Sequence, residues 1–424
     1  MSAVTAEPSS LRLVLRAKFV RRLLVFSQTG RLPMAAAPLA LLLFAREVHG
    51  LALAGLVVAA YTAGMAVSAP LLARTVDRWR QPPVLWASAL LSAAGFVVVA
   101  ASAHRVPVLL AGAVFAGLGT PPLEACLRAL WPALVPAGSV PAAYSLDLAV
   151  QEVIYVTGPL VTLAAVGLAG PAAGLLAAAV LQLAGVAGFA LTPVVRTWRG
   201  EAGERHWAGP LRVPRFVMIV AGVICAGAAV GSLPVVVTGY AEAAGNRALS
   251  GWMLAAQAVG ALAGGLLYTR ATSGGSGRLP LTAAVFAAGY VPLLLVPGPV
   301  PMALLLAVSG LALPPLLTAV FLAADRLTPP GTAVEAFAWI ITAFTVGSAA
   351  GAAITGPLVS DGIRYGFTLA PVAGLLAVAA MCAATYLGRR PHPAPLLLPT
   401  PPAAPTSEAG PTPDRAHLAP HPEP

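Results

Sequence analysis

Two carboxylates interrupt an apolar stretch of helical length, 144-YSLDLAVQEVIYVTGPLV-161. The acids are Asp147 and Glu152, and a carboxylate in an apolar environment is costly unless it is paired, hydrogen-bonded or protonated. Such a group can hold an arginine, or it can exchange a proton against a bound solute. At 100° per residue the two acids lie about 140° apart around a helix, so they do not share a face.

The polar residues around these acids form two stripes along the helix. Tyr144, Asp147 and Gln151 make one stripe, and Glu152, Tyr155 and Pro159 make the other. One stripe could face a central cavity and the other a neighbouring helix. The sequence leaves open which stripe faces which.

Arg31 supplies a positive charge at a similar depth. It lies nine residues after Arg22, about 13 Å at 1.5 Å per residue, and Glu152 lies about 16 Å beyond Pro141. The matching depths predict an Arg31–Glu152 ion pair. That pair could be structural, or it could be a site where a proton or a solute competes for the acid.

Three further acids are candidates for pairing. Glu124 and Arg128 are four residues apart, which predicts a pair within one helix, although Arg128 could instead reach Asp77 across a gate. Glu335 opens an apolar run, where an acid suits the helix dipole, and it is also a candidate for a transport or proton site. It shares a face with Trp339, which could stack on a solute or belong to an interfacial aromatic belt. Weaker buried polar candidates for a cavity are Tyr61, Gln182 and Gln257.

The composition requires an environment other than water. Hydrophobic residues make up 58% of the 424 and charged residues 9%, against about 25% charged in soluble domains. So few charges cannot cover a water-facing surface, so the outside must face lipid. The net charge of +10 is spread over short loops, which argues against nucleic acid as a partner. Three scattered cysteines and the histidines show no metal-ligand spacing, so no metal or cofactor is expected.

Twelve apolar runs are long enough to approach the thickness of a bilayer, and a spanning helix satisfies its own backbone hydrogen bonds. The predicted fold is therefore an all-α integral membrane protein with twelve transmembrane helices. The runs are 22–45, 51–73, 83–103, 106–128, 141–167, 170–194, 215–238, 250–270, 280–297, 301–323, 334–358 and 366–388.

Basic residues predict the orientation. With the N-terminus inside, 20 of the 25 lysines and arginines fall in cytoplasmic segments, four fall in outer loops, and Arg31 lies inside the first span. This asymmetry follows the positive-inside rule, and both termini are expected in the cytoplasm.

The chain is expected to divide into two six-helix halves. The longest inner connection separates them, and 157-TGPLV-161 recurs as 355-TGPLV-359 in the corresponding span. Parallel halves place a site near the midplane where they meet. The predicted segments are a cytoplasmic N-terminal segment (1–21), two six-helix pseudo-symmetric bundles (22–194 and 215–388), a central loop (195–214) and a Pro-rich cytoplasmic tail (389–424).

This organisation resembles the major facilitator superfamily, and the loop 69-APLLARTVDRWRQPPV-84 strengthens the resemblance. Asp77 and Arg78 match the family signature, whereas Ala73 and Arg80 stand where it has glycines. The resemblance implies a cytoplasmic gate formed by Asp77, Arg78 and Arg128. From the residues alone, Asp77 could pair with Arg78 or Arg128, or cap a neighbouring helix.

The resemblance further implies a secondary active transporter, similar to bacterial drug exporters. We expect a monomer in the bacterial cytoplasmic membrane that moves a small amphipathic or hydrophobic solute, with protons as the coupling ion. Gly158-Pro159 is similar to the proton-antiporter signature, but Ile154 replaces its first glycine. The alternative is a transport-silent receptor or assembly protein on the same fold. No zinc spacing, nucleophile elbow or phosphate loop is present, so an enzyme is not expected.

Overall fold

The computed structural model describes residues 10–102, 104–200, 208–246, 248–268 and 279–387. All regular secondary structure in these ranges is helical, as predicted. The predicted tail 389–424 and part of the predicted N-terminal segment and central loop lie outside the described residues.

Among its described residues, the first half contains eight helices and a short 3-10 turn. Helix α2 holds two spans, because the chain reverses at Gly50 with φ +76°, a conformation that favours glycine. The elements are α1 (Ser10–Arg16), α2 (Val20–Arg78), α3 (Gln81–Ala101), α4 (Val106–Leu118), α5 (Leu123–Leu134), η1 (Ala137–Ser139), α6 (Val140–Ala169), α7 (Pro171–Ala190) and α8 (Pro193–Thr197).

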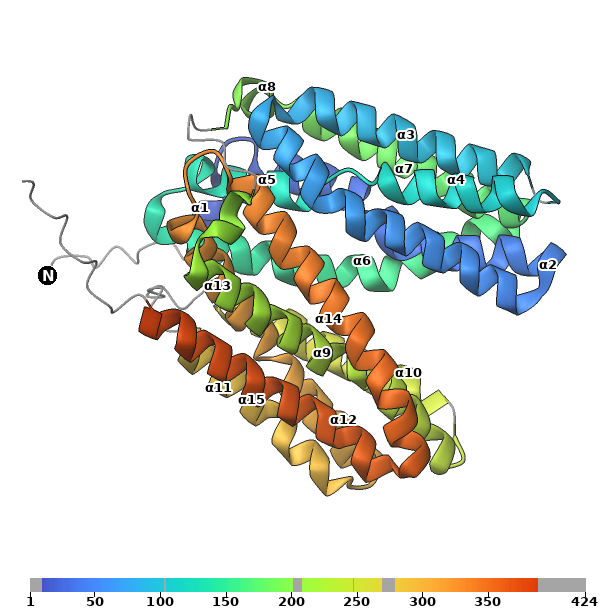
Figure 1. Cartoon of the computed structure of the whole chain (residues 1–424), viewed down its shortest axis with the longest axis vertical. Helices are drawn as coiled ribbons and strands as arrows, with labels where there is room; N and C mark the ends of the chain where they lie inside the picture. Colours follow the sequence, from blue (N-terminus) through green and yellow to red (C-terminus); the bar gives the residue numbers. More distant parts are fainter. Residues whose placement is uncertain (1–9, 103, 201–207, 247, 269–278, 388–424) are drawn as a thin grey trace, which may run out of the picture. The chain divides into compact units, whose positions relative to one another are not determined.

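The second half follows the turn η2 (Gly209–Arg212). Its helices are α9 (Pro214–Ala243), α10 (Ala248–Tyr268), α11 (Leu279–Tyr290) with η4 (Val291–Leu295), α12 (Pro299–Gly310), α13 (Leu313–Leu327), α14 (Ala333–Asp361) and α15 (Ile363–Leu387) (Figure 1). Among the described residues, eleven segments are long and apolar enough to span a membrane, and Leu279–Leu295 is a shorter apolar helix. These twelve segments correspond to the twelve predicted runs.

Spans four and ten are each broken at a proline pair. The sequences 117-GLGTPPL-123 and 310-GLALPPL-316 lie 193 residues apart, where α4 gives way to α5 and α12 to α13. Proline cannot donate a backbone N–H and clashes with the preceding turn, so each pair ends one helix and starts the next. The breaks are thus a structural repeat between the halves.

Tyr61 and Gln257 occupy corresponding places beside these breaks. A Cβ at Gly117 would lie 2.1 Å from the carbonyl oxygen of Tyr61, and one at Gly310 would lie 2.2 Å from that of Gln257. Both backbones therefore pack closely on a glycine. The Tyr61 side chain is buried and packs on Phe96, with the ring centroids 5.9 Å apart. The Tyr61 side chain is thus a packing group of its own half, whereas at Gln257 the closely packed group is the backbone.

The end of the molecule where α2 both begins and ends carries Arg21, Arg22, Arg74 and Arg78; we call it the arginine-rich end. Near it, α6 is buried on every side from Ala142 to Ala149, and α14 from Val334 to Ala338. Further along, burial on α14 recurs only every fourth residue, one face of the helix. The halves therefore enclose both helices at the arginine-rich end and separate beyond it.

Glycines set the spacing of α9 and α14, which pack side by side along their length. A Cβ at Gly347 would lie 2.0 Å from the carbonyl oxygen of Ile224, and one at Gly351 would lie 2.1 Å from that of Ala228. Small residues four apart let two helix backbones approach in this way. Gly347 and Gly351 thus form a helix-packing face of α14.

We expect Gly347→Ala to lower the thermal unfolding midpoint of the detergent-purified protein by several degrees. Overpacking of a filled interface destabilises by about 1–3 kcal/mol. Gly356→Ala is the matched control on the same helix, because a Cβ there meets no atom within 4 Å. Unfolding can be followed by tryptophan fluorescence. Equal midpoints for the two variants would contradict this account of the interface.

Candidate functional site

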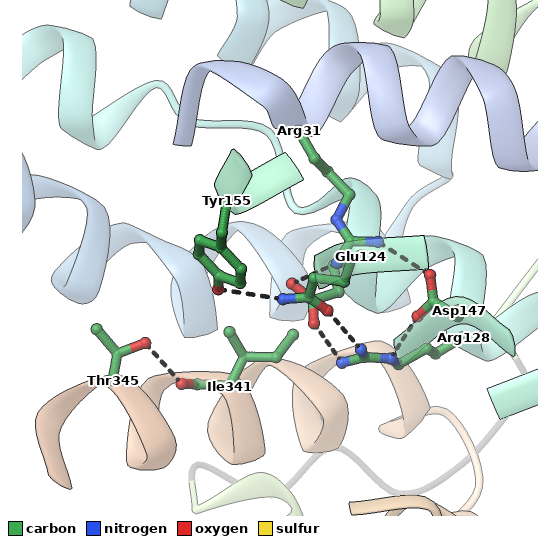
Figure 2. Close-up of polar contacts among 8 residues, drawn as sticks. Arg31, Glu124, Arg128, Asp147, Tyr155, Ile341 and Thr345 are labelled. Atoms are coloured by element: carbon green, nitrogen blue, oxygen red, sulfur yellow. Dashed lines mark hydrogen bonds and ion pairs between the residues drawn. The ribbon is translucent and has the colours of Figure 1, made fainter. Parts of the chain in front are cut away.

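Four charged side chains form a closed ring at the centre of the first half. Each arginine contacts both acids: Arg31 lies 2.9 Å from Asp147 and 3.2 Å from Glu124, and Arg128 lies 3.0 Å from Asp147 and 2.5 Å from Glu124 (Figure 2). The side chains are between 0% and 10% exposed. The alternating charges sum to zero, which is how four ionised groups can be held in an apolar interior.

Three helices bring these residues together. Arg31 comes from the first span in α2, Glu124 and Arg128 from α5, and Asp147 from α6. The proline break before α5 starts a new helix at Leu123, so Glu124 stands in its first turn. Glu124 and Arg128 are then one helical turn apart and pair as the sequence predicted.

The predicted Arg31–Glu152 pair is wrong. Arg31 takes Glu124 and Asp147 as its partners instead. The depth argument placed Arg31 and the acidic helix at the right level but could not fix the rotation of α6. Because Asp147 and Glu152 lie on different faces, turning Asp147 towards Arg31 turns Glu152 away. The suggested alternative of Arg128 with Asp77 is also not found, since Arg128 pairs within the ring.

The predicted stripe of Tyr144, Asp147 and Gln151 converges on Arg128. Besides the Asp147 ion pair, Arg128 donates to Gln151 Oε1 at 3.3 Å, and the Tyr144 hydroxyl donates to the Arg128 carbonyl at 3.5 Å. Gln151 in turn donates to the Tyr155 hydroxyl at 3.4 Å. Residues on one face of α6 thus supply further polar partners for Arg128.

A cavity of about 280 Å³ lies beside the ring. Glu124, Arg128, Gln151, Glu152 and Tyr155 line it from the first half. Its other wall comes from α13 and α14 and is apolar apart from Thr345. That wall consists of Leu313, Leu317, Phe321, Ile340, Ile341, Phe344 and Thr345.

A second, smaller cavity shares Glu124 and Ile341 with the first. Arg31 and Gln182 line it, and Gln182 accepts a hydrogen bond from Ser92 at 3.3 Å. Of the other predicted cavity residues, Tyr61, Tyr144, Gln257 and Trp339 line neither of these two cavities. Glu124 is therefore the acid that lines both cavities.

Aromatic residues of the second half meet the ring directly. The Arg128 guanidinium lies over the Phe321 ring, 4.0 Å from its centroid. Tyr144, Phe321 and Phe337 form a triangle with centroids 5.8–6.0 Å apart. The 193-residue repeat relates Arg128 to Phe321 and Tyr144 to Phe337, and this offset is the signal that could have pointed to the two phenylalanines.

Asp77 caps the first turn of α14. Its carboxylate accepts backbone N–H groups of Val334 at 3.1 Å and Glu335 at 2.7 Å. An anion suits the positive N-terminal end of a helix dipole. Of the three roles that the sequence left open for Asp77, the structure therefore has the helix cap. This contact joins the two halves at the arginine-rich end.

Glu335, whose backbone N–H Asp77 accepts, adds side-chain contacts to the same junction between the halves. Arg74 pairs with it at 2.5 Å, and the Trp339 indole N–H donates to it at 3.4 Å. No role in a site was predicted for Arg74 from the sequence. Arg78, predicted for the gate, is exposed at the end of α2. We call Arg74, Asp77 and Glu335, with the first turn of α14, the latch.

Comparison with known proteins agrees with this architecture. A family model described as Major Facilitator Superfamily matches residues 26–333. The chain belongs to this superfamily. Its members are transporters, so the chain is a multi-pass membrane transporter with the twelve-helix fold. No curated protein sequence matched the chain.

Solved structures of the same superfamily fold are similar at low sequence identity. A bacterial homologue of the iron transporter ferroportin in an outward-facing state aligns with TM-score 0.70 and 18% identity, covering 86% of this chain and 99% of that one. The E. coli fucose:proton symporter FucP aligns with TM-score 0.68 and 14% identity, covering 87% and 99%. The human organic anion transporter MFSD10 aligns with TM-score 0.57 and 16% identity, covering 88% and 100%. At these identities the likeness shows the fold alone.

Removing one acid from the ring should destabilise the protein strongly. Asp147→Asn preserves size but leaves two buried arginines with one carboxylate, and breaking a buried pair costs about 3–5 kcal/mol. We expect a large fall in the unfolding midpoint in detergent. Glu152→Gln, on the same helix but outside the ring, is the matched control and should melt close to the wild type. If both variants melt alike, the ring is not a structural centre.

Weakening the latch should open the arginine-rich end. Asp77→Asn removes the charge that caps α14, an effect of about 1–2 kcal/mol, or five- to thirty-fold in the ratio of closed to open forms. Spin labels at the exposed positions Trp79 and Pro330, in a cysteine-free background, would report longer distances. Asp361→Asn, at the far end of α14, should leave the distance distribution unchanged. An unchanged distribution in Asp77→Asn would count against the latch.

Proposed function

We propose that the chain is a secondary active transporter that exports a small amphipathic or hydrophobic solute in exchange for protons. The observation that carries this proposal is the cavity between the halves. One wall holds a carboxylate outside the neutral ring, and the other wall is apolar. An acid near the midplane can bind a proton when no solute is present, and the apolar wall suits a hydrophobic solute.

Alternating access follows from where the halves touch. The latch and the Arg128–Phe321 contact hold the halves together at the arginine-rich end. The arginine count supports a cytoplasmic location for this end and for both termini, in a bacterial cytoplasmic membrane. In this orientation the cavity of the present structure opens outward. Loss of the latch and closure of the opposite end would give the inward-facing form.

The acids divide into two roles in this proposal. Asp147 is fully buried between two arginines and holds the first half together. Glu152 lines the cavity and is half-buried, so it can meet water and solute. Glu152 is therefore the proposed proton carrier, and Glu124, at the cavity edge of the ring, is the group through which a change of charge would reach the arginines.

The printed names of the similar structures do not decide direction or solute. They include a fucose:proton symporter, an organic anion transporter and a homologue of an iron transporter. Proton coupling has a precedent among them, whereas export rests on the resemblance to drug exporters. A transport-silent receptor on the same fold is the alternative, and it predicts solute binding without flux.

The test is transport in proteoliposomes with an imposed pH gradient. A panel of fluorescent amphipathic solutes should move against their gradient in the wild type when protons flow the opposite way. Glu152→Gln should lose the effect of the pH gradient while keeping downhill exchange, because its side chain cannot carry a proton. Asp361→Asn is the control with an exposed acid removed. Equal gradient-driven transport by Glu152→Gln and wild type would remove Glu152 as the carrier.

A further inference from the structure

We infer that the solute is a monovalent organic cation whose charge binds at Glu152 and whose apolar body packs on the α13–α14 wall. This inference rests on the transport function proposed above and identifies the substrate class of the same cavity. The observation behind it is that the charged side chains around the cavity are already paired with one another, apart from Glu152.

Each of the two arginines near the cavity is already paired with two carboxylates. Arg31 holds Glu124 and Asp147, and its side chain is 3% exposed. Arg128 holds the same two acids, donates to Gln151, and is 1% exposed. An anionic solute could bind an arginine only by displacing a buried carboxylate, which would then lie unpaired in an apolar interior. Such an exchange is strongly unfavourable.

The charge left over in the cavity is negative. The ring of two arginines and two acids is neutral, and Glu152 lies outside it. Within the described part of the chain, Glu152 makes no ion pair with any of the four ring residues. When ionised, Glu152 gives the cavity a charge of minus one. A proton or one monovalent cation would neutralise it, so the two compete for a single carboxylate.

The remaining lining suits an organic cation. Phe321 and Phe344 lie on the opposite wall, and Tyr155, half exposed, stands one turn after Glu152. Aromatic ring faces attract cations, and an aliphatic wall binds an apolar body. A small inorganic cation such as Ca²⁺ instead requires six to eight oxygen ligands. One carboxylate facing rings and aliphatic side chains therefore matches a bulky, singly charged solute.

Two probes of nearly the same shape and opposite charge test the inference. Tetraphenylphosphonium is a cation and tetraphenylborate an anion, and each can be titrated against the detergent-purified full chain. We expect saturable binding of the phosphonium at least about tenfold tighter than that of the borate. Glu152→Gln should weaken phosphonium binding about tenfold or more. Glu152→Asp should retain it within a few fold, and Asp361→Asn should match the wild type.

The pH dependence of phosphonium binding tests whether the charge of Glu152, rather than the shape of the probe, governs the affinity. Because a proton and the cation compete for Glu152, acidification should weaken phosphonium binding by the wild type and have little effect on Glu152→Gln. Borate binding equal to or tighter than phosphonium binding would overturn the inference. So would a Glu152→Gln variant that binds the phosphonium as the wild type does.

Binding without a gradient keeps this test separate from the test of transport. If the phosphonium binds through Glu152 but no solute crosses proteoliposomes, the cation site stands and the transporter proposal fails. If gradient-driven transport is found but the borate is the preferred ligand, the transporter proposal stands and the cation inference fails.

Discussion

The structure depends on the neutralisation of two arginines and two acids inside an apolar protein. None of these groups could remain ionised alone at that depth without a large penalty. Joined in a ring, they fix three helices relative to one another: the first span of α2, the short α5 and the first part of α6. The rotation of α6 follows from this constraint, because Asp147 must face the arginines. That rotation in turn presents Glu152 and Tyr155 to the cavity.

The halves differ chemically although they share a design. Both contain a span broken at a proline pair, and both use a glycine there to admit a neighbouring backbone. The first half places Glu124 and Arg128 after its break, whereas the second places Leu317 and Phe321 at the corresponding positions. Charge is thus concentrated on one side of the cavity and apolar surface on the other. The contact of Arg128 with Phe321 joins the two sides where they meet.

The latch joins the two halves, whereas the ring joins helices of the first half. The latch binds α14 through backbone N–H groups and one arginine, contacts that a modest free energy can make or break. The ring lies within one half and need not change when the halves move. The ring, which must stay intact, is therefore separate from the latch, which must break when the arginine-rich end opens. Glu124 and the Arg128–Phe321 contact lie at the boundary between them.

The sequence by itself determined the class of fold and the main charged participants. Composition required lipid around the protein, the apolar runs gave the number of spans, and the four-residue spacing of Glu124 and Arg128 gave their pairing. Tertiary structure alone decided which acid Arg31 meets, since depth along a helix follows from residue count but rotation about its axis follows from packing. It also decided the partners of Asp77 and Glu335, because those contacts join residues more than 250 positions apart. No local pattern encodes which loop will lie against which helix end, and so the latch and the role of Arg74 emerged only from the folded chain.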